Sequence, residues 1–201
     1  VALACLVDGG FKVRGTVRNK DDPAKLEQYK VAFGKHFDKL ELVNADLLDD
    51  ASLAQAIQGS TYVIHVASPF VYGKSDDEVI KPAVDGTIGV LKACQATKVK
   101  RCVVTSSCLS VFMVSEANRP VGKFTEANWS EPEACGDDNY SKSKVLAEKA
   151  AWKFMEDLPA EEKFELTCVL PAFVMGPPIT PASGTSVGFV QGILSGGMAE
   201  I

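Results

Sequence analysis

The chain has 201 residues, of which 46% are apolar and 23% charged, and its formal net charge is -5. This composition is typical of an ordinary globular domain and excludes a low-complexity, collagen-like or disordered chain. With only 21 lysines and arginines and a pI near 5.1, the chain offers no basic surface for nucleic acid, so we expect no nucleic-acid partner.

The cysteines and the hydropathy pattern exclude two further classes of protein. The six cysteines stand singly, mostly inside apolar runs, and no Cys-x-x-Cys pair with a matching histidine or second pair occurs. We therefore expect reduced thiols, no disulfide scaffold and no metal site. No stretch approaches the roughly 18 to 20 uninterrupted apolar residues of a membrane span, and the N-terminal residues lack the pattern of a signal peptide. We expect a cytoplasmic protein with no membrane partner.

The first predicted elements are a short helix end, a strand and a charged helix. Residues 1–7 are apolar, and the glycines at 9–10 close this segment as they would close a helix. Val1 is not methionine and opens inside the segment without a cap, which indicates a fragment. Residues 11–18 alternate apolar and polar side chains, a pattern that predicts a strand, and a charged helical segment follows over 23–37.

From residue 40 onwards, apolar runs of strand length alternate with stretches of helical spacing. The predicted strands are 40–45, 61–67, 101–106 and 164–170, and the predicted helices are 50–59, 76–97 and 138–158. Because the strands are too apolar to face water, we predict an α/β fold with a doubly wound parallel sheet covered by helices on both faces. The chain turns rich in glycine and serine after Gly176, so we expect one domain over 1–176 and the start of a second lobe over 177–201.

Tyr140 and Lys144 lie four residues apart in the helix predicted over 138–158, and hence on one face of it. A nearby cation lowers the pKa of a tyrosine from its usual value of about 10 and makes the phenol a useful acid or base at neutral pH. Taken alone, the pair also fits a helix with one core aromatic residue and one solvated lysine.

Ser107 follows the strand predicted over 101–106. In an open parallel sheet, ligands bind beyond the carboxyl ends of the strands, so a hydroxyl at this place can bind a carbonyl oxygen. The alternative is a serine that ends the strand or caps a helix.

Arg18 ends the strand predicted over 11–18. In dinucleotide-binding folds, an acidic residue at the end of the second strand binds the ribose 2′-hydroxyl, whereas an arginine there suits a 2′-phosphate. Lys25 would assist, and we therefore expect NADP(H) as the cofactor. Alternatively, Asp21 and Asp22 pair with these cations at the surface. No Gly-x-Gly-x-x-Gly loop occurs, so the phosphate cradle of such folds is missing from this chain.

Short motifs follow one another in a specific order along nearly the whole chain. They are Val13-Arg-Gly-Thr-Val-Arg18, Ala45-Asp-Leu47, His65-Val-Ala-Ser-Pro69, the segment 79–87, Val104-Thr-Ser-Ser107, Tyr140-x-x-x-Lys144, Ala147-Glu-Lys-Ala150 and Pro171-Ala-Phe-Val-Met-Gly-Pro177. The ordered set resembles the extended short-chain dehydrogenase/reductases of the NAD-dependent epimerase/dehydratase superfamily, in the branch of dihydroflavonol reductases, cinnamoyl-CoA reductases and yeast-type methylglyoxal reductases. The resemblance implies a Rossmann-like NAD(P)-binding domain that lacks its first strand and glycine-rich loop.

The resemblance also implies roles for single residues. Tyr140 would protonate the carbonyl oxygen of the substrate as general acid, Lys144 would lower the tyrosine pKa and hold the nicotinamide ribose, and Ser107, rather than Ser106, would orient the carbonyl. The other cofactor contacts would come from Arg18 and Lys25 at the 2′-phosphate, Asp46 and Leu47 at the adenine, Val66, Ala67 and Ser68 near the phosphates and ribose, and Pro171, Ala172 and Val174 beside the nicotinamide. His65 would belong to the cofactor wall or the core and not to a metal site.

We therefore expect an NADPH-dependent oxidoreductase that reduces a ketone or aldehyde of a small molecule by hydride transfer. One alternative is a truncated family member that binds a cofactor or a partner without chemistry. Another is an NAD-dependent sugar-nucleotide epimerase or dehydratase, against which Arg18 argues. Because the missing first strand lies mid-sheet in the order 3-2-1-4-5-6, we expect its loss to split the sheet and to leave these 201 residues poorly folded.

Overall fold

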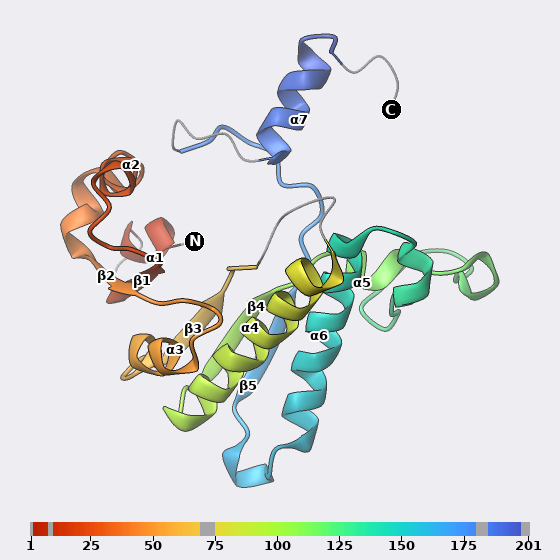
Figure 1. Cartoon of the computed structure of the whole chain (residues 1–201), viewed down its shortest axis with the longest axis horizontal. Helices are drawn as coiled ribbons and strands as arrows, with labels where there is room; N and C mark the ends of the chain where they lie inside the picture. Colours follow the sequence, from red (N-terminus) through yellow and green to blue (C-terminus); the bar gives the residue numbers. More distant parts are fainter. Residues whose placement is uncertain (1, 8–9, 69–74, 180–184, 198–201) are drawn as a thin grey trace. The chain divides into compact units, whose positions relative to one another are not determined.

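The computed structural model of the chain divides into two compact units. One unit consists of residues 1–45 and 173–201, and the other of residues 46–172. The structure describes residues 2–7, 10–68, 75–179 and 185–197 (Figure 1). Val1 and the first of the two glycines at 9–10, which the sequence marked as the beginning and end of a helical segment, lie outside the described residues.

The unit formed by residues 1–45 and 173–201 contains a small parallel sheet. Its elements are α1 (Ala2–Val7), β1 (Val13–Val17), α2 (Pro23–Phe33), the 3₁₀ helix η1 (Gly34–Lys39), β2 (Leu40–Asn44) and α7 (Thr185–Leu194). Val13 lies opposite Leu40 and Val17 opposite Asn44, and α2 forms the crossover between the two strands. The strand predicted over 11–18 is therefore present over its central residues.

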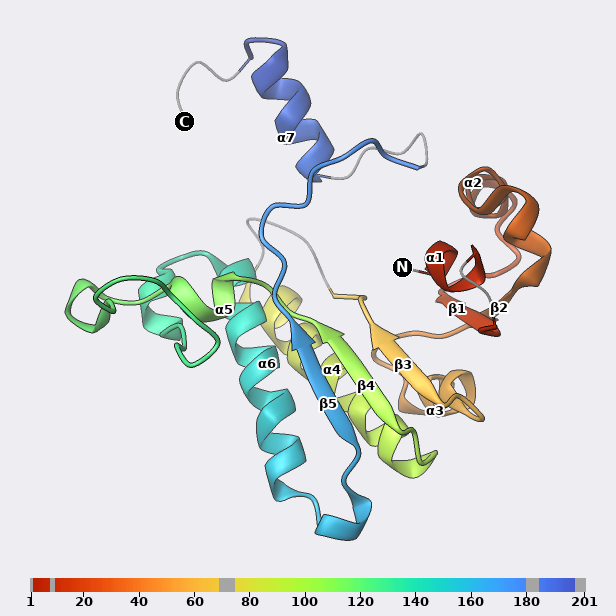
Figure 2. The same cartoon turned by 180° about the vertical axis from the view of Figure 1, so that it is seen from behind.

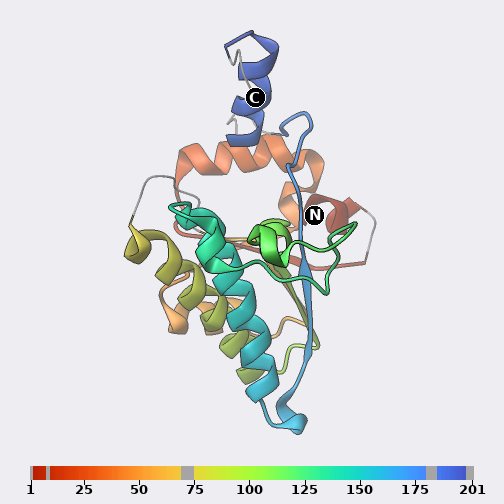
Figure 3. The same cartoon turned by 90° about the vertical axis from the view of Figure 1, so that its right-hand side faces the viewer.

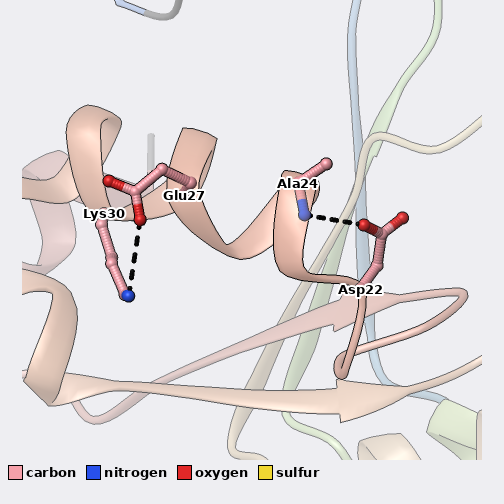
Figure 4. Close-up of polar contacts among 4 residues, drawn as sticks. All are labelled: Asp22, Ala24, Glu27 and Lys30. Carbon is pink, nitrogen blue, oxygen red and sulfur yellow. Dashed lines mark hydrogen bonds and ion pairs between the residues drawn. The ribbon is translucent and has the colours of Figure 1, made fainter.

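Helix α2 begins at a side-chain cap. The Asp22 carboxylate accepts hydrogen bonds from the backbone N–H groups of Ala24 (3.0 Å) and Lys25 (3.2 Å), and a proline occupies the first helical position. Figure 4 shows this cap together with the exposed ion pair between Glu27 and Lys30, whose charged atoms are 3.5 Å apart. Exposed pairs contribute little to stability, so the cap is the stronger determinant of where the helix starts.

The unit formed by residues 46–172 contains the larger sheet. Its elements are α3 (Asp50–Ile57), β3 (Tyr62–His65), α4 (Asp76–Ala96), β4 (Arg101–Thr105), α5 (Leu109–Phe112), the 3₁₀ helices η2 (Glu116–Asn118) and η3 (Pro132–Cys135), α6 (Asn139–Asp157), the 3₁₀ helix η4 (Ala160–Glu162) and β5 (Glu165–Val169). The strand order is β3-β4-β5, and both pairings are parallel. The predicted α/β class with parallel strands is confirmed.

Helices α4 and α6 lie side by side on one face of the β3-β4-β5 sheet (Figures 1 and 3). Each buries one stripe of small and apolar side chains, as the helical spacing of the sequence predicts. The largest fully buried apolar side chains between the helices and the sheet are Val79, Leu91 and Cys94 of α4, Cys102 of β4 and Val145 of α6. This core fixes α6, which carries Tyr140 and Lys144, against the strand β4, which Ser107 follows.

The opposite face of the same sheet carries exposed apolar side chains. Tyr62, Ile64 and Val169 alternate with inward-facing residues along β3 and β5 and keep between 45% and 55% of their surface exposed. Figure 2 shows the three strands in front of α4.

The strands form two separate parallel sheets among the described residues, β1-β2 in one unit and β3-β4-β5 in the other. The expected effect of a missing first strand on the sheet stays a prediction. The expected domain boundary after residue 176 stays a prediction.

Three further properties concern the membrane, metals and thiols. No described helix is both long and apolar enough to cross a membrane. Among the same residues, no group of three or more histidine, cysteine, aspartate and glutamate side chains is arranged to hold a metal ion. All six cysteines are free thiols. The cytoplasmic location stays a prediction.

Candidate active site

Tyr140 and Lys144 stand on the first turns of α6, and Asp138 sets where this helix begins. The Asp138 carboxylate accepts hydrogen bonds from the backbone N–H groups of Tyr140 (3.1 Å) and Ser141 (3.2 Å), and the Ser141 hydroxyl also donates to it. The Lys144 ammonium lies 5.7 Å from the centroid of the Tyr140 ring. Lys144 is only 8% exposed, so the alternative of a solvated lysine does not apply.

Burial changes the ionisation of two side chains beside Tyr140. Desolvation lowers the pKa of Lys144 from its usual value. His65 at the end of β3 is equally buried, and desolvation together with the charge of Lys144 lowers its pKa to about 4. The Thr87 hydroxyl donates to the Ala83 carbonyl (2.8 Å), so in the long 3.5 Å contact between Thr87 and His65 the imidazole Nε2–H is the donor. Because its pKa is about 4, His65 is neutral at physiological pH.

Ser106 and Ser107 form a buried turn directly after β4, and they are 7% and 8% exposed. The backbone N–H of Ser106 donates to the Val169 carbonyl (2.9 Å), which continues the pairing with β5. The N–H of Cys108 donates to the Pro171 carbonyl (3.0 Å). The turn lies at the carboxyl edge of the sheet, where ligands bind in open parallel sheets.

The two hydroxyls of this turn have different partners. The Ser106 hydroxyl donates to the Glu148 carboxylate and lies 3.0 Å from the Ser110 hydroxyl, so its proton is already in use. The Ser107 oxygen accepts from the Leu109 N–H (3.2 Å), which is the capping role of the alternative interpretation. Accepting a hydrogen bond leaves the O–H of Ser107 as a donor. Ser107 can therefore cap the turn and still bind a carbonyl oxygen.

Asp46 and Leu47 follow β2 and have local structural partners. The Asp46 carboxylate accepts from the Leu48 N–H (2.9 Å), and the Asp46 N–H donates to the Ser52 hydroxyl (3.0 Å). The Leu47 side chain packs against α4 at Gly86, where an added Cβ would lie 3.2 Å from the Leu47 Cβ. These contacts fix the segment between β2 and α3, and its role at an adenine stays a prediction.

The segment 66–68 continues from β3 towards the buried site. Val66 is exposed, whereas Ala67 and Ser68 line a cavity of about 10 Å³. The same cavity is lined by residues of β3, β4, α4, α6 and the serine turn, among them His65, Thr87, Ser106, Lys144 and Glu148. The structure therefore brings Ala67 and Ser68 close to Lys144, and their contacts with a cofactor stay predictions.

The segment after β5 contains the three residues expected beside the nicotinamide. Pro171 is tied to the serine turn through its carbonyl, which accepts from Cys108. Ala172 is the last residue of the same unit and is exposed. Val174 is also exposed and belongs to the other unit, and the contacts of all three residues with a nicotinamide stay predictions.

Arg18 and Lys25 belong to the unit formed by residues 1–45 and 173–201. Arg18 follows β1, Lys25 lies in the first turn of α2, and both are exposed. The Asp22 carboxylate, one of the two surface partners considered for these cations, instead accepts backbone N–H groups at the start of α2. Binding of a 2′-phosphate by Arg18 and Lys25 stays a prediction.

The sequence analysis assigned no role to Glu148, which is a buried acceptor in the middle of this site. It is 5% exposed and accepts from the Ser106 hydroxyl and from the Nε1–H of Trp152 (3.3 Å). Burial and the nearby Glu148 carboxylate raise the pKa of Cys168 on β5 to about 12. The available sequence signal was its position four residues after Lys144, on the same face of the helix.

The sequence of the chain matches one known protein family and several curated reductases. The 3-beta hydroxysteroid dehydrogenase/isomerase family matches residues 12–184. The chain belongs to this family. The bifunctional dihydroflavonol 4-reductase/flavanone 4-reductase of Malus domestica is 36% identical over 189 residues, which cover 90% of this chain and 52% of that protein. Tetraketide alpha-pyrone reductase 1 of Arabidopsis thaliana is 37% identical over 193 residues, which cover 93% of this chain and 57% of that protein. The chain thus spans about half the length of these curated relatives.

Solved structures of related reductases share the fold of this chain. Yeast methylglyoxal/isovaleraldehyde reductase Gre2, complexed with NADPH, matches with a TM-score of 0.71 and 32% identity over 86% of this chain and 54% of that chain. Vestitone reductase from alfalfa (Medicago sativa) matches with a TM-score of 0.73 and 29% identity over 95% of this chain and 58% of that chain. The resemblance to the reductase branch of the extended short-chain dehydrogenase/reductases is confirmed, and with it the Rossmann-like fold class.

Proposed function

We propose that the protein is an NADPH-dependent oxidoreductase that reduces a ketone or aldehyde group of a small molecule. The observation that carries the proposal is the buried Lys144 ammonium 5.7 Å from the centroid of the Tyr140 ring. Ser107, in the same unit, has an O–H available as a donor at the carboxyl end of β4. The names of the relatives support the reaction class, and the NADPH complex of Gre2 supports the cofactor.

The donor set of the chain fits a dinucleotide that carries a 2′-phosphate. Arg18 and Lys25 are exposed cations at the end of β1 and the start of α2. This strand end contacts the adenosine ribose in dinucleotide-binding folds, and an arginine suits a phosphate by charge and by bidentate geometry. The residues proposed to hold the remaining parts of the cofactor are Asp46 and Leu47 at the adenine, Val66, Ala67 and Ser68 near the phosphates and ribose, Tyr140 and Lys144 at the nicotinamide ribose, and Pro171, Ala172 and Val174 beside the nicotinamide. When bound, NADPH supplies the hydride.

Ser107, Tyr140 and Lys144 have separate tasks in this reaction. The Ser107 hydroxyl donates a hydrogen bond to the carbonyl oxygen of the substrate and orients it. Tyr140 donates its phenolic proton to the same oxygen while the carbonyl carbon is reduced, so an alcohol forms and the phenol becomes a phenolate. The Lys144 ammonium stabilises this phenolate, and its burial strengthens the attraction because little water screens the two charges.

The test of the proposal is Tyr140→Phe in the native protein that contains this sequence. We expect NADPH oxidation with a panel of small ketones and aldehydes to fall by at least about 100-fold, because the general acid is lost. NADPH binding, measured by the quenching of tryptophan fluorescence, should weaken only modestly, because Tyr140 supplies one of many proposed contacts with the cofactor. Retained turnover would refute the role of Tyr140, and a wild-type protein that binds NADPH but reduces no carbonyl compound would favour the non-catalytic alternative.

A further inference from the structure

The Glu148 carboxylate links helix α6 to the serine turn after β4. Glu148 lies one helical turn beyond Lys144 and is 5% exposed. Its carboxylate accepts from the hydroxyl of Ser106, which lies 42 residues earlier in the chain, and from the Nε1–H of Trp152 at 3.3 Å. Ser106 directly precedes Ser107. A single buried side chain therefore joins the two elements that carry the proposed catalytic groups.

The hydrogen bonds around this carboxylate run in one direction. A hydroxyl has one proton, and Ser106 uses its proton on Glu148. In the 3.0 Å contact between the two serine hydroxyls, Ser110 is therefore the donor and Ser106 the acceptor. Ser106 and Trp152 both donate to Glu148, and a carboxylate, which only accepts, satisfies both of them. A glutamine has one oxygen and one NH₂ group. Its oxygen can accept from Trp152, but its NH₂ group can bind Ser106 only if the Ser106 hydroxyl rotates and becomes an acceptor.

Ser110 continues the connection to the backbone of the turn. Its N–H donates to the Ser107 carbonyl (2.9 Å), and its own carbonyl accepts from the Ser130 N–H (2.9 Å). Lys149, the neighbour of Glu148 on α6, donates to the Ser130 carbonyl (3.1 Å). Two consecutive residues of α6 therefore hold the serine turn, one through a side chain and the other through the segment that packs on it.

Glu148 also lines two cavities. One has a volume of about 10 Å³, and Lys144 and Ser106 form part of its wall. The other has a volume of about 270 Å³ and is lined by Trp129 and Trp152 among other residues. The Glu148 side chain therefore belongs to the walls of both cavities.

We propose that Glu148 is a positioning residue for the carbonyl reduction, an inference that rests on the proposed function. By accepting the Ser106 hydroxyl, Glu148 fixes the serine turn against α6 and so sets the place of the Ser107 hydroxyl relative to the Tyr140 phenol. It acts through Ser106 and contacts neither the substrate nor the cofactor in this role. A misplacement of about 1 Å at a reacting group costs roughly 100-fold in rate, so the loss of this contact should appear in kcat.

The first experiment compares Glu148→Leu and Glu148→Gln with the control Glu156→Gln in the native protein that contains this sequence. Glu156 is an exposed glutamate on the same helix, so the control removes a carboxylate outside the cluster. We expect Glu148→Leu to lower kcat by about 100-fold while KM for NADPH stays unchanged. Glu148→Gln should recover part of the rate, because Ser106 can accept from the amide and donate to Ser110. The control should match the wild type. A wild-type kcat in Glu148→Leu would overturn the proposal.

The second experiment reads the position of the turn without catalysis and includes Ser106→Ala, which leaves Glu148 in place. Hydrogen exchange of the amides of residues 106–110 should accelerate in Ser106→Ala and in Glu148→Leu, and the double variant should exchange no faster than the single ones. Acceleration spread over the whole unit, or additive effects in the double variant, would overturn the proposal. If the wild type reduces no carbonyl compound, the proposed function fails, whereas these exchange rates still decide whether Glu148 holds the turn.

Discussion

The two units of the chain hold their proposed site residues in opposite ways. In residues 46–172, the Lys144 ammonium, the Glu148 carboxylate and the serine turn are buried, and among the described residues every buried apolar side chain except Leu6 belongs to this unit. In the other unit, Arg18 and Lys25 are exposed. In the proposed function, burial organises the chemistry of the reaction, whereas charges in water recognise the cofactor phosphate. Substitutions should therefore change rate and stability in one unit and cofactor preference in the other.

Of the substitutions that test this difference between the units, Lys144→Met should have the largest effect on the rate. We expect kcat to fall by roughly 100- to 1,000-fold, because the phenolate of Tyr140 loses its cation. The free energy of unfolding should not fall, because methionine fills a similar volume without a buried charge. Steady-state kinetics and urea denaturation measure the two quantities, with Lys142→Met as the control on the same helix. A loss of stability that accounts for the loss of rate would contradict the prediction.

The buried His65 should make this unit sensitive to acid. Its pKa of about 4 lies below the usual 6.5, so between these values the unfolded chain binds a proton that the folded chain does not. The free energy of unfolding should therefore decrease as the pH falls from about 6.5 to 4, by roughly 3 kcal/mol in total. Urea denaturation at several pH values measures this decrease, which His65→Gln should remove. If the matched change His36→Gln in the other unit removed it instead, the assignment to His65 would be wrong.

Replacing Arg18 by glutamine should change cofactor preference alone. We expect KM for NADPH to rise by about 10-fold or more, since a hydrogen bond to a charged group is lost, while KM for NADH and the melting temperature stay the same. Kinetics with both cofactors are the measurement, and Lys12→Gln at the opposite end of β1 is the control. Equal changes for the two cofactors would exclude a role at the 2′-phosphate.

The smallest effect should come from the cap of α2. Asp22→Ala removes the acceptor for the N–H groups of Ala24 and Lys25, which should lower the free energy of unfolding by about 1 kcal/mol. Asp21→Ala, the same change one residue earlier and outside the cap, should leave the urea midpoint unchanged. If the two variants lost the same stability, surface charge rather than capping would explain the loss.

Local patterns predicted the two long helices of the unit formed by residues 46–172. The stripe over 76–97 became α4 (Asp76–Ala96) and the stripe over 138–158 became α6 (Asn139–Asp157), because helical spacing and caps depend on neighbouring residues. Helix α5 was missed because it depends on tertiary contacts, such as the hydrogen bond from the Met113 N–H to the Ser130 hydroxyl (2.8 Å).

The candidate site was likewise predictable where it depends on spacing within one helix, and not where it depends on contacts between distant residues. The spacing of Tyr140 and Lys144 on one helix face follows from the sequence, and their 5.7 Å contact agrees with it. The burial of Lys144 and the contact between Ser106 and Glu148 could not be read from the sequence, because they join residues that are far apart in the chain. The use of the Ser106 proton by this contact is what distinguishes the two serines of the turn.

The exposed face of the β3-β4-β5 sheet has a practical consequence for work with this chain in solution. Tyr62, Ile64 and Val169 present aromatic and β-branched side chains on a sheet surface, which is the kind of surface on which chains associate. When the protein is concentrated, we expect the amount that precipitates to grow faster than linearly with the protein concentration. Fusion to a highly charged carrier protein should reduce this precipitation. Precipitation would then limit the concentration at which the chain can be handled.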